Sequence, residues 1–225
     1  MDIQSLPKEV LFSLFLQVEP KEIKTVCFWK NKKVREICNS KYFQEAYKQK
    51  YREVDFFGRK DLTENDFKNL TGAYSVNLWN TNVRDEDLKY LTGVSIIKLS
   101  HTKVADAGMK YLSNNPNLSK IYLFHTQVTD EGMKYLFNTH SPNISTIDLA
   151  NTKVTDAGLK YLFNTPNLTT IYLAGTKVTD IGLTYLSGVK TIDLEYTQVT
   201  DVGANYLRST GTTKIYGKFL KKRNI

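Results

Sequence analysis

One motif recurs along most of the chain, and this recurrence restricts the fold more than any other feature. Residues 147–162 read I-D-L-A-N-T-K-V-T-D-A-G-L-K-Y-L, and residues 171–186 read I-Y-L-A-G-T-K-V-T-D-I-G-L-T-Y-L. Seven copies of this frame are marked by pairs of residues two positions apart: Val76 and Leu78, Ile97 and Leu99, Ile121 and Leu123, Ile147 and Leu149, Ile171 and Leu173, Ile192 and Leu194, and more faintly Thr213 and Ile215. The second members lie 21 to 26 residues apart, which predicts a stack of similar units.

Each part of the frame has a physical reason. Apolar residues two apart face one side of a short strand, so successive copies are expected to pair in parallel. A threonine hydroxyl can satisfy backbone groups where the chain leaves each strand, and it occurs at Thr81, Thr102, Thr126, Thr152, Thr176 and Thr197. We expect the aspartate of each copy to N-cap a short helix, and the glycine two residues later to allow close approach of helix to strand. Asp87 replaces that glycine in the first full copy, which we expect to pack more loosely.

This frame resembles the leucine-rich repeats of F-box and related intracellular proteins, in the subgroup that reads L-x-x-T-x-V-T-D-x-G-L-x-x-L. The resemblance covers about residues 54–216, and a degenerate copy around Val54–Phe56 and Glu64–Leu70 is expected to start the array. It implies an α/β fold, a leucine-rich-repeat solenoid with parallel strands inside and short helices outside. We expect six to seven repeats in a domain of residues 51–216, followed by a basic tail at 217–225.

The first fifty residues follow another pattern. Apolar residues at helical spacing after Pro7 predict an amphipathic helix, and Pro20 is expected to end it. Further helices are expected around Ile23–Cys27 and Val34–Tyr47, making a small all-α unit over residues 1–50.

This unit resembles the F-box, the segment by which substrate receptors dock on the Skp adaptor of a cullin-RING ubiquitin ligase. The family pattern L-P-x-E-L-L-x-x-I-F-x-x-L-D-x-x-x-L aligns without a gap on Leu6, Pro7, Glu9, Val10, Leu11, Leu14, Phe15, Val18, Glu19 and Ile23. The family's V-C-K-x-W departs here, because Val26–Trp29 lies about three residues early. The resemblance implies adaptor contacts at Leu6, Pro7, Glu9, Val10, Leu11, Leu14 and Phe15. The alternative is an N-terminal helical cap that protects the first strand of the solenoid.

The strand face opposite the helices is the expected target-binding surface, and we expect it to be concave. Its exposed positions are the residue between each apolar pair and the one or two after it, Ser100 among them. The small residues Ala150, Ala174 and Gly175 beside the aromatic residues are expected to leave a hollow. Aromatic side chains give large contact areas at low entropic cost. The predicted target-binding residues are Trp79, Lys98, Tyr122, Phe124, Asp148, Tyr172, Asp193 and Tyr196.

Charge and motif content argue against other classes of function. The formal net charge is +8, but residues 1–60 and 214–225 each carry +5, which leaves −2 for the repeats. A basic stripe for nucleic acid is therefore not expected. His101 and His125 occupy the same slot of adjacent copies, yet no Asp, Glu or Cys shares that slot, so we expect no metal, no cofactor and no catalysis.

The remaining expectations concern location and redox state. No segment approaches the length of apolar chain that crosses a bilayer, and no secretory signal is apparent. Cys27 and Cys38 lie in apolar surroundings, which favours two buried thiols over a disulfide.

Together these features predict the substrate-recognition subunit of a Skp-cullin-F-box ubiquitin ligase. It would contact a Skp-type adaptor, and cullin through it, and hold an unknown protein substrate. It would act in the cytoplasm or nucleus of a eukaryotic cell, including a host cell. The alternative is a leucine-rich-repeat interaction scaffold unrelated to ubiquitin.

Overall fold

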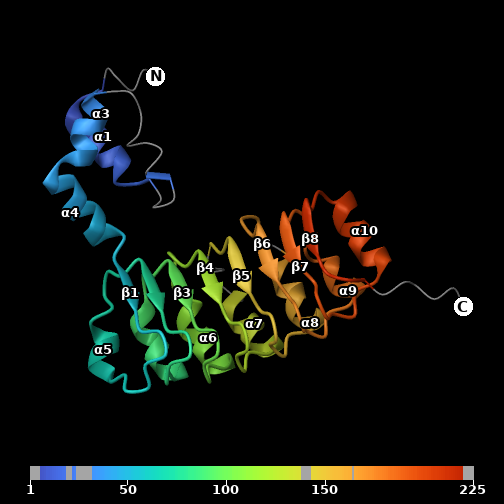
Figure 1. Ribbon diagram of the computed structural model, residues 1–225. Coiled ribbons are helices and arrows are strands. Elements are labelled where there is room, and N and C mark those ends of the chain that lie inside the picture. The colour runs from blue at the N-terminus through green and yellow to red at the C-terminus, as the bar shows by residue number, and fades with distance from the viewer. Residues whose placement is uncertain (1–5, 19–21, 24–31, 138–142, 164, 220–225) are drawn as a thin grey trace, which may run out of the picture. The chain divides into compact units, whose positions relative to one another are not determined.

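A computed structural model describes residues 6–18, 22–23, 32–137, 143–163 and 165–219. The chain divides into two compact units, Met1–Glu53 with Gly72–Tyr74 and Val54–Thr71 with Ser75–Ile225. The first unit is helical and the second is the solenoid (Figure 1).

The helical unit contains α1 (Lys8–Phe15), α3 (Lys32–Asn39) and α4 (Lys41–Lys50). Pro7 is the N-cap residue of α1, and the Ser40 hydroxyl caps α4 by accepting a hydrogen bond from the Phe43 N–H. The buried core is shared by all three helices and consists of Leu11, Phe15, Val34, Ile37, Cys38 and Phe43. Cys38 is disulfide-bonded, so the expectation of two free thiols is wrong. Cys27, Glu19 and the segment Val26–Trp29 lie outside the described residues.

The solenoid is one parallel sheet of eight strands in sequence order (Figure 1). Its strands are β1 (Glu53–Asp55), β2 (Ser75–Asn77), β3 (Ile96–Lys98), β4 (Lys120–Tyr122), β5 (Thr146–Asp148), β6 (Thr170–Tyr172), β7 (Thr191–Asp193) and β8 (Lys214–Tyr216). Helical segments alternate with them: α5 (Glu64–Lys68), η2 (Asp85–Leu91), α6 (Asp106–Leu112), α7 (Asp130–Phe137), α8 (Asp156–Leu159), η3 (Lys160–Leu162), α9 (Asp180–Leu183) and α10 (Asp201–Ser209). This confirms the predicted solenoid, which the degenerate first copy extends to eight strands.

The predicted core phase is correct for the full copies. Ile97, Ile121, Ile147, Ile171 and Ile192 pair in register across β3 to β7 and are fully buried. The apolar pair of the last copy begins two residues later than predicted, because Ile215 rather than Thr213 pairs with Ile192. Tyr216 therefore aligns with Asp193.

The threonine of each copy has the expected role. Its hydroxyl donates to the carbonyl of the leucine three residues earlier, from Thr81 to Leu78 at 2.8 Å and from Thr152 to Leu149 at 2.6 Å, and likewise in the other copies. The residue before each threonine is in the left-handed region, including His101 with φ 57° and Tyr196 with φ 57°. The chain therefore turns sharply at the end of each strand.

The repeated aspartate does not cap its own helix, which corrects the prediction. Thr155 is the N-cap residue of α8, and the carboxylate of Asp130 from the preceding copy accepts from the Thr155 N–H at 2.7 Å and the Thr155 hydroxyl at 2.6 Å. We call this pair of hydrogen bonds between neighbouring copies the latch. The same latch joins Asp106 to Thr129, Asp156 to Thr179 and Asp180 to Thr200.

The recurring glycine makes room for this latch as well as for close packing of the helix, because a Cβ on Gly158 would also lie 3.0 Å from Cγ1 of Val154. A Cβ atom on Gly158 would lie 2.4 Å from Oδ1 of Asp130, and a Cβ on Gly182 would lie 2.3 Å from Oδ1 of Asp156. A side chain at either glycine would therefore displace the carboxylate of the preceding copy.

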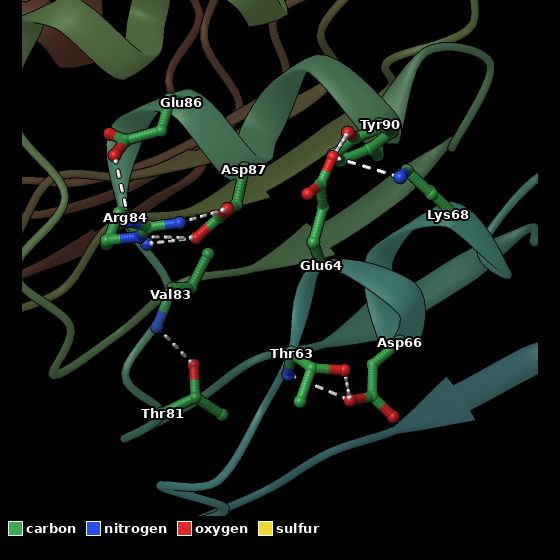
Figure 2. A network of polar contacts seen from close by, with 10 residues as sticks. All are labelled: Thr63, Glu64, Asp66, Lys68, Thr81, Val83, Arg84, Glu86, Asp87 and Tyr90. Atoms are coloured by element: carbon green, nitrogen blue, oxygen red, sulfur yellow. Dashed lines mark hydrogen bonds and ion pairs between the residues drawn. The ribbon is translucent and has the colours of Figure 1, made fainter.

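The first two repeats are capped from within. The Asp66 carboxylate accepts from the Thr63 N–H at 2.8 Å and the Thr63 hydroxyl at 2.7 Å, while Asp87 accepts from the backbone and guanidinium of Arg84 (Figure 2). Asp87 occupies the glycine slot and is only 4% exposed. Its carboxylate is buried and accepts hydrogen bonds from Arg84, while the looser packing expected of this copy stays a prediction.

Candidate functional site

The open face of the sheet, on the side away from the helices, carries one aligned row of side chains. Strand pairing puts Asn77 opposite Lys98, Lys98 opposite Tyr122, and so on through the sheet. We call this the central row, and its members are Asn77, Lys98, Tyr122, Asp148, Tyr172, Asp193 and Tyr216. Residues at these positions alternate with the buried isoleucines and so face away from the core.

Five of the eight predicted target-binding residues lie in this row: Lys98, Tyr122, Asp148, Tyr172 and Asp193. All five are half-buried. Tyr216 also belongs to the row and was missed, because the last copy was read in the wrong frame. It is 51% exposed, and shifting the frame by two residues would have found it.

The remaining predicted residues, Trp79, Phe124 and Tyr196, lie where the chain leaves the strands. Trp79 is 38% exposed, Tyr196 is 88% exposed and Phe124 is half-buried. Ser100 and Ala150, expected to be exposed, are buried. The register sets Ser100 between Trp79 and Phe124, and Ala150 next to Phe124, so these small side chains lie below larger neighbours.

An aromatic strip runs along the exits of the first strands. Trp79 stacks on His101 with ring centroids 5.5 Å apart, and His101 contacts Phe124 at 4.8 Å and His125 at 4.9 Å. Phe57, which is 60% exposed, extends the strip at 6.1 Å from Trp79. Sequence reasoning missed Phe57 because it follows the degenerate first copy.

His101 and His125, which occupy the same slot of adjacent copies, lie with their ring centroids 4.9 Å apart. Burial lowers the pKa of His101, and the neighbouring His125 lowers it further. Within the described ranges, no group of three or more His, Cys, Asp or Glu side chains is arranged to hold a metal ion.

The electrostatics of the central row are dominated by Asp148. Burial raises the pKa of Asp148 to about 6, with a smaller contribution from the Asp193 carboxylate and against the lowering effect of the hydrogen bond from the Ala150 N–H. Burial also raises the pKa of Tyr122, as do Tyr172 and Asp148 nearby. The ionised form of Asp148 is thus poorly stabilised within the chain.

The predicted adaptor-binding residues divide into two sets. Leu11 and Phe15 are buried in the helical core, and Leu6 is half-buried and packed against it. The other four, Pro7, Glu9, Val10 and Leu14, are exposed, with Val10 at 42% and Leu14 at 46%. On another part of the same unit, Tyr42 is 73% exposed and stacks on Phe12 with centroids 5.2 Å apart.

Comparison with known proteins supports the fold. The family model described as Leucine Rich repeat matches residues 114–137 and 140–163. Internalin C2 of Listeria monocytogenes is similar in structure over 95% of this chain and 96% of its own, with 18% identity and a TM-score of 0.51. A leucine-rich-repeat protein of Leptospira interrogans is similar over 72% of this chain and 41% of its own, with 13% identity and a TM-score of 0.52.

A second Listeria internalin matches over 76% of this chain and 62% of its own, with 17% identity and a TM-score of 0.46. The chain thus spans less than two thirds of the length of two of these three proteins. No curated protein gives a significant match. The chain has the fold of a leucine-rich-repeat solenoid, and the family model matches two stretches within it. No helix among the described residues has the length and apolar character to cross a membrane.

Proposed function

We propose that the chain is a non-catalytic protein-interaction scaffold that binds a protein partner on the open face of its sheet. The observation that carries the proposal is the aligned central row together with the aromatic strip beside it. Solvent-facing aromatic side chains are typical of binding surfaces, where they supply most of the contact energy. Parallel sheets of repeat proteins present such extended surfaces to partners.

Matched variants test this proposal. Tyr122→Ser with Phe124→Ser removes two aromatic groups from the open face, whereas Ile181→Ser with Val202→Ser removes two apolar groups that are 68% and 49% exposed at the starts of α9 and α10. A partner captured by the wild-type chain should be lost from the first variant and kept by the second. Loss from both variants, or from the second alone, would place the binding surface elsewhere. Thermal unfolding of both variants checks that they fold.

A second candidate is the substrate receptor of a Skp-cullin-F-box ligase, acting in the cytoplasm or nucleus of a eukaryotic cell. One observation favours it: Val10 and Leu14 expose apolar surface on α1 while Leu11 and Phe15 are buried. The disulfide at Cys38 counts against it, because disulfides are rare in the cytosol. The comparisons lend it no support, so we rank it below the scaffold.

A direct binding assay separates the two candidates. Purified Skp-type adaptor should co-elute with the chain if α1 is an F-box helix, and Val10→Ser with Leu14→Ser should abolish this. Lys41→Ser with Lys48→Ser, on the exposed surface of α4, serves as the control. An adaptor that does not bind the wild-type chain at low salt rules out the second candidate and leaves the scaffold untouched.

A further inference from the structure

The central row alternates between tyrosine and aspartate over its last five strands. Tyr122, Asp148, Tyr172, Asp193 and Tyr216 follow one another on β4 to β8, each paired with the next by strand register. Neighbouring parallel strands lie about 4.8 Å apart, so the same side chain recurs about every 9.6 Å. A carboxylate with a tyrosine on each side therefore occurs twice along this part of the face.

Neither carboxylate is paired with a cation in the described part of the chain. Oδ1 of Asp148 accepts one hydrogen bond from the Ala150 N–H at 3.0 Å, and Oδ1 of Asp193 accepts one from the Glu195 N–H at 3.0 Å. Among the described residues, no ion pair reaches either aspartate. Each carboxylate thus has an oxygen available to a ligand.

This part of the row is acidic. The row from Tyr122 to Tyr216 carries two carboxylates and no lysine or arginine, and residues 61–213 together carry a formal net charge of −2. A basic ligand is therefore attracted to this part of the sheet rather than to the basic segments 1–60 and 214–225. Tyrosine rings flanking a carboxylate add cation–π attraction for an ammonium or guanidinium group.

We propose that β4 to β8 bind an extended segment of the partner that presents arginine or lysine side chains at every third position. This deepens the proposed function, on which it rests, by naming the chemistry of the partner. A polyproline II segment has three residues per turn and rises about 3.1 Å per residue, so its i and i+3 side chains lie about 9.3 Å apart on one side. That distance matches the separation of Asp148 from Asp193, about two strand spacings.

The proposal predicts how binding depends on pH. Because burial raises the pKa of Asp148 to about 6, its carboxylate is largely neutral below that pH and charged above it. A cationic ligand favours the charged form, so affinity should rise between about pH 5 and about pH 7.5.

Other charged groups face this part of the sheet. They are Lys98 on β3, Lys120 on β4, Asp193 on β7, Lys214 on β8, and His125 and Glu195 where β4 and β7 end. Among side chains, histidine has the ordinary pKa closest to this pH range. His101→Asn with His125→Asn isolates the contribution of the two histidines, because asparagine tolerates the left-handed backbone of both positions.

Two fluorescent peptides of equal composition test the proposal with the full chain. One reads Arg-Pro-Pro-Arg-Pro-Pro-Arg, and the other reads Arg-Arg-Arg-Pro-Pro-Pro-Pro. The spaced peptide should bind about tenfold or more tightly than the clustered one, as measured by fluorescence anisotropy at low salt. Asp148→Asn with Asp193→Asn should remove this preference and the dependence on pH.

The matched control is Glu45→Gln with Asp201→Asn, which removes two acidic charges from outside the open face and should leave binding unchanged. Equal affinity for the two peptides, absence of binding, or unaltered binding by Asp148→Asn with Asp193→Asn would overturn the inference. If the partner is still lost from Tyr122→Ser with Phe124→Ser in that event, the scaffold function stands and only the chemistry of the partner is wrong.

Discussion

The helix N-termini of the first two repeats of the solenoid are capped differently from those of the later repeats. In α5 and η2, an acid within the repeat caps its own helix: Asp66 for Thr63 and Asp87 for Arg84 (Figure 2). From α7 onward, the carboxylate belongs to the preceding repeat, and a threonine at the N-cap donates hydrogen bonds to it. Asp85 marks the transition, because it accepts from the Ala105 N–H at 2.8 Å but Ala105 has no hydroxyl to donate.

This difference explains why the position two residues after the repeated acid is Asp87 in one repeat and glycine in the later ones. A glycine leaves room for the carboxylate of the preceding copy, while Asp87 fills that room itself. At the N-cap the self-capped repeats use their own acid, whereas the latched repeats depend on the acid of a neighbour. Between the first two repeats, the Tyr90 hydroxyl instead donates a hydrogen bond to Glu64 (Figure 2). In a solenoid, such neighbour terms largely determine how cooperatively the array unfolds.

Removing a latch aspartate should have the largest effect. Asp130→Ala deletes two hydrogen bonds to Thr155 and should lower the free energy of unfolding by about 2 to 3 kcal/mol, as expected for bonds to a charged acceptor. Asp201→Ala is the control, since no hydrogen bond joins its carboxylate to another copy in the described part of the chain. It should cost about 0.5 kcal/mol, the helix-dipole contribution that both variants lose. Equal losses in urea unfolding would contradict the latch.

Asp148 differs from the latch aspartates, because the fold buries its carboxylate and disfavours its ionised form. Its pKa of about 6 lies above the ordinary 3.8, so the neutral form stabilises the fold. That stability is fully present below about pH 4 and is lost as the pH rises through about 6. Asp148→Asn should therefore raise the free energy of unfolding at about pH 8 by about 1 to 3 kcal/mol, and by less at about pH 4. A variant that destabilises the chain equally at both pH values would refute this.

Replacing Gly158 with a larger residue should disrupt the same latch, because this glycine leaves room for the carboxylate of Asp130. Gly158→Ala puts a Cβ 2.4 Å from Oδ1 of Asp130, so the loss of stability should be about 1 to 2 kcal/mol, after the gain in helix propensity of about 1 kcal/mol. The double variant with Asp130→Ala should be little worse than Asp130→Ala alone, because both changes remove one interaction. Additive losses would show that the glycine has a separate role.

Transplanting the latch should have the smallest net effect. Asp87→Gly alone removes the self-cap of η2 and should cost about 1 to 2 kcal/mol. Adding Glu64→Asp and Arg84→Thr supplies both partners of a latch between the first two repeats, and should return the stability to within about 1 kcal/mol of wild type. Failure of the triple variant to recover would mean that the two capping schemes are not interchangeable.

The sequence was sufficient for features that depend on local spacing. The strand phase follows from apolar pairs such as Ile147 and Leu149, and the threonine bond spans only three residues, so both were predicted correctly. The partner of Asp130 could not be predicted, because an aspartate at that spacing fits its own helix as well as the next copy. Gly217 stands where earlier copies have leucine, and without that apolar residue the last frame was shifted.

The candidate site was predictable within the strands but not beyond their ends. Alternation along a strand correctly placed Tyr122 and Asp148 on one face. It failed for Ser100 and Ala150, because regular alternation ends where the chain turns and the size of the neighbours then decides exposure. The pairing of tyrosines with aspartates emerges only from the order of strands, which joins residues more than twenty positions apart.

The latch also bears on how such a chain can change in length. Copies such as residues 147–162 and 171–186 carry both halves, an aspartate for the next copy and a threonine with glycine for the previous one. A duplicated copy inserted between two others would find a donor and an acceptor already in place. Whole copies can therefore be gained or lost within α7 to α10 without interrupting the latch pattern, while α5 and η2 form a fixed beginning. The open face would lengthen with each gain, and with it the segment of partner that it spans.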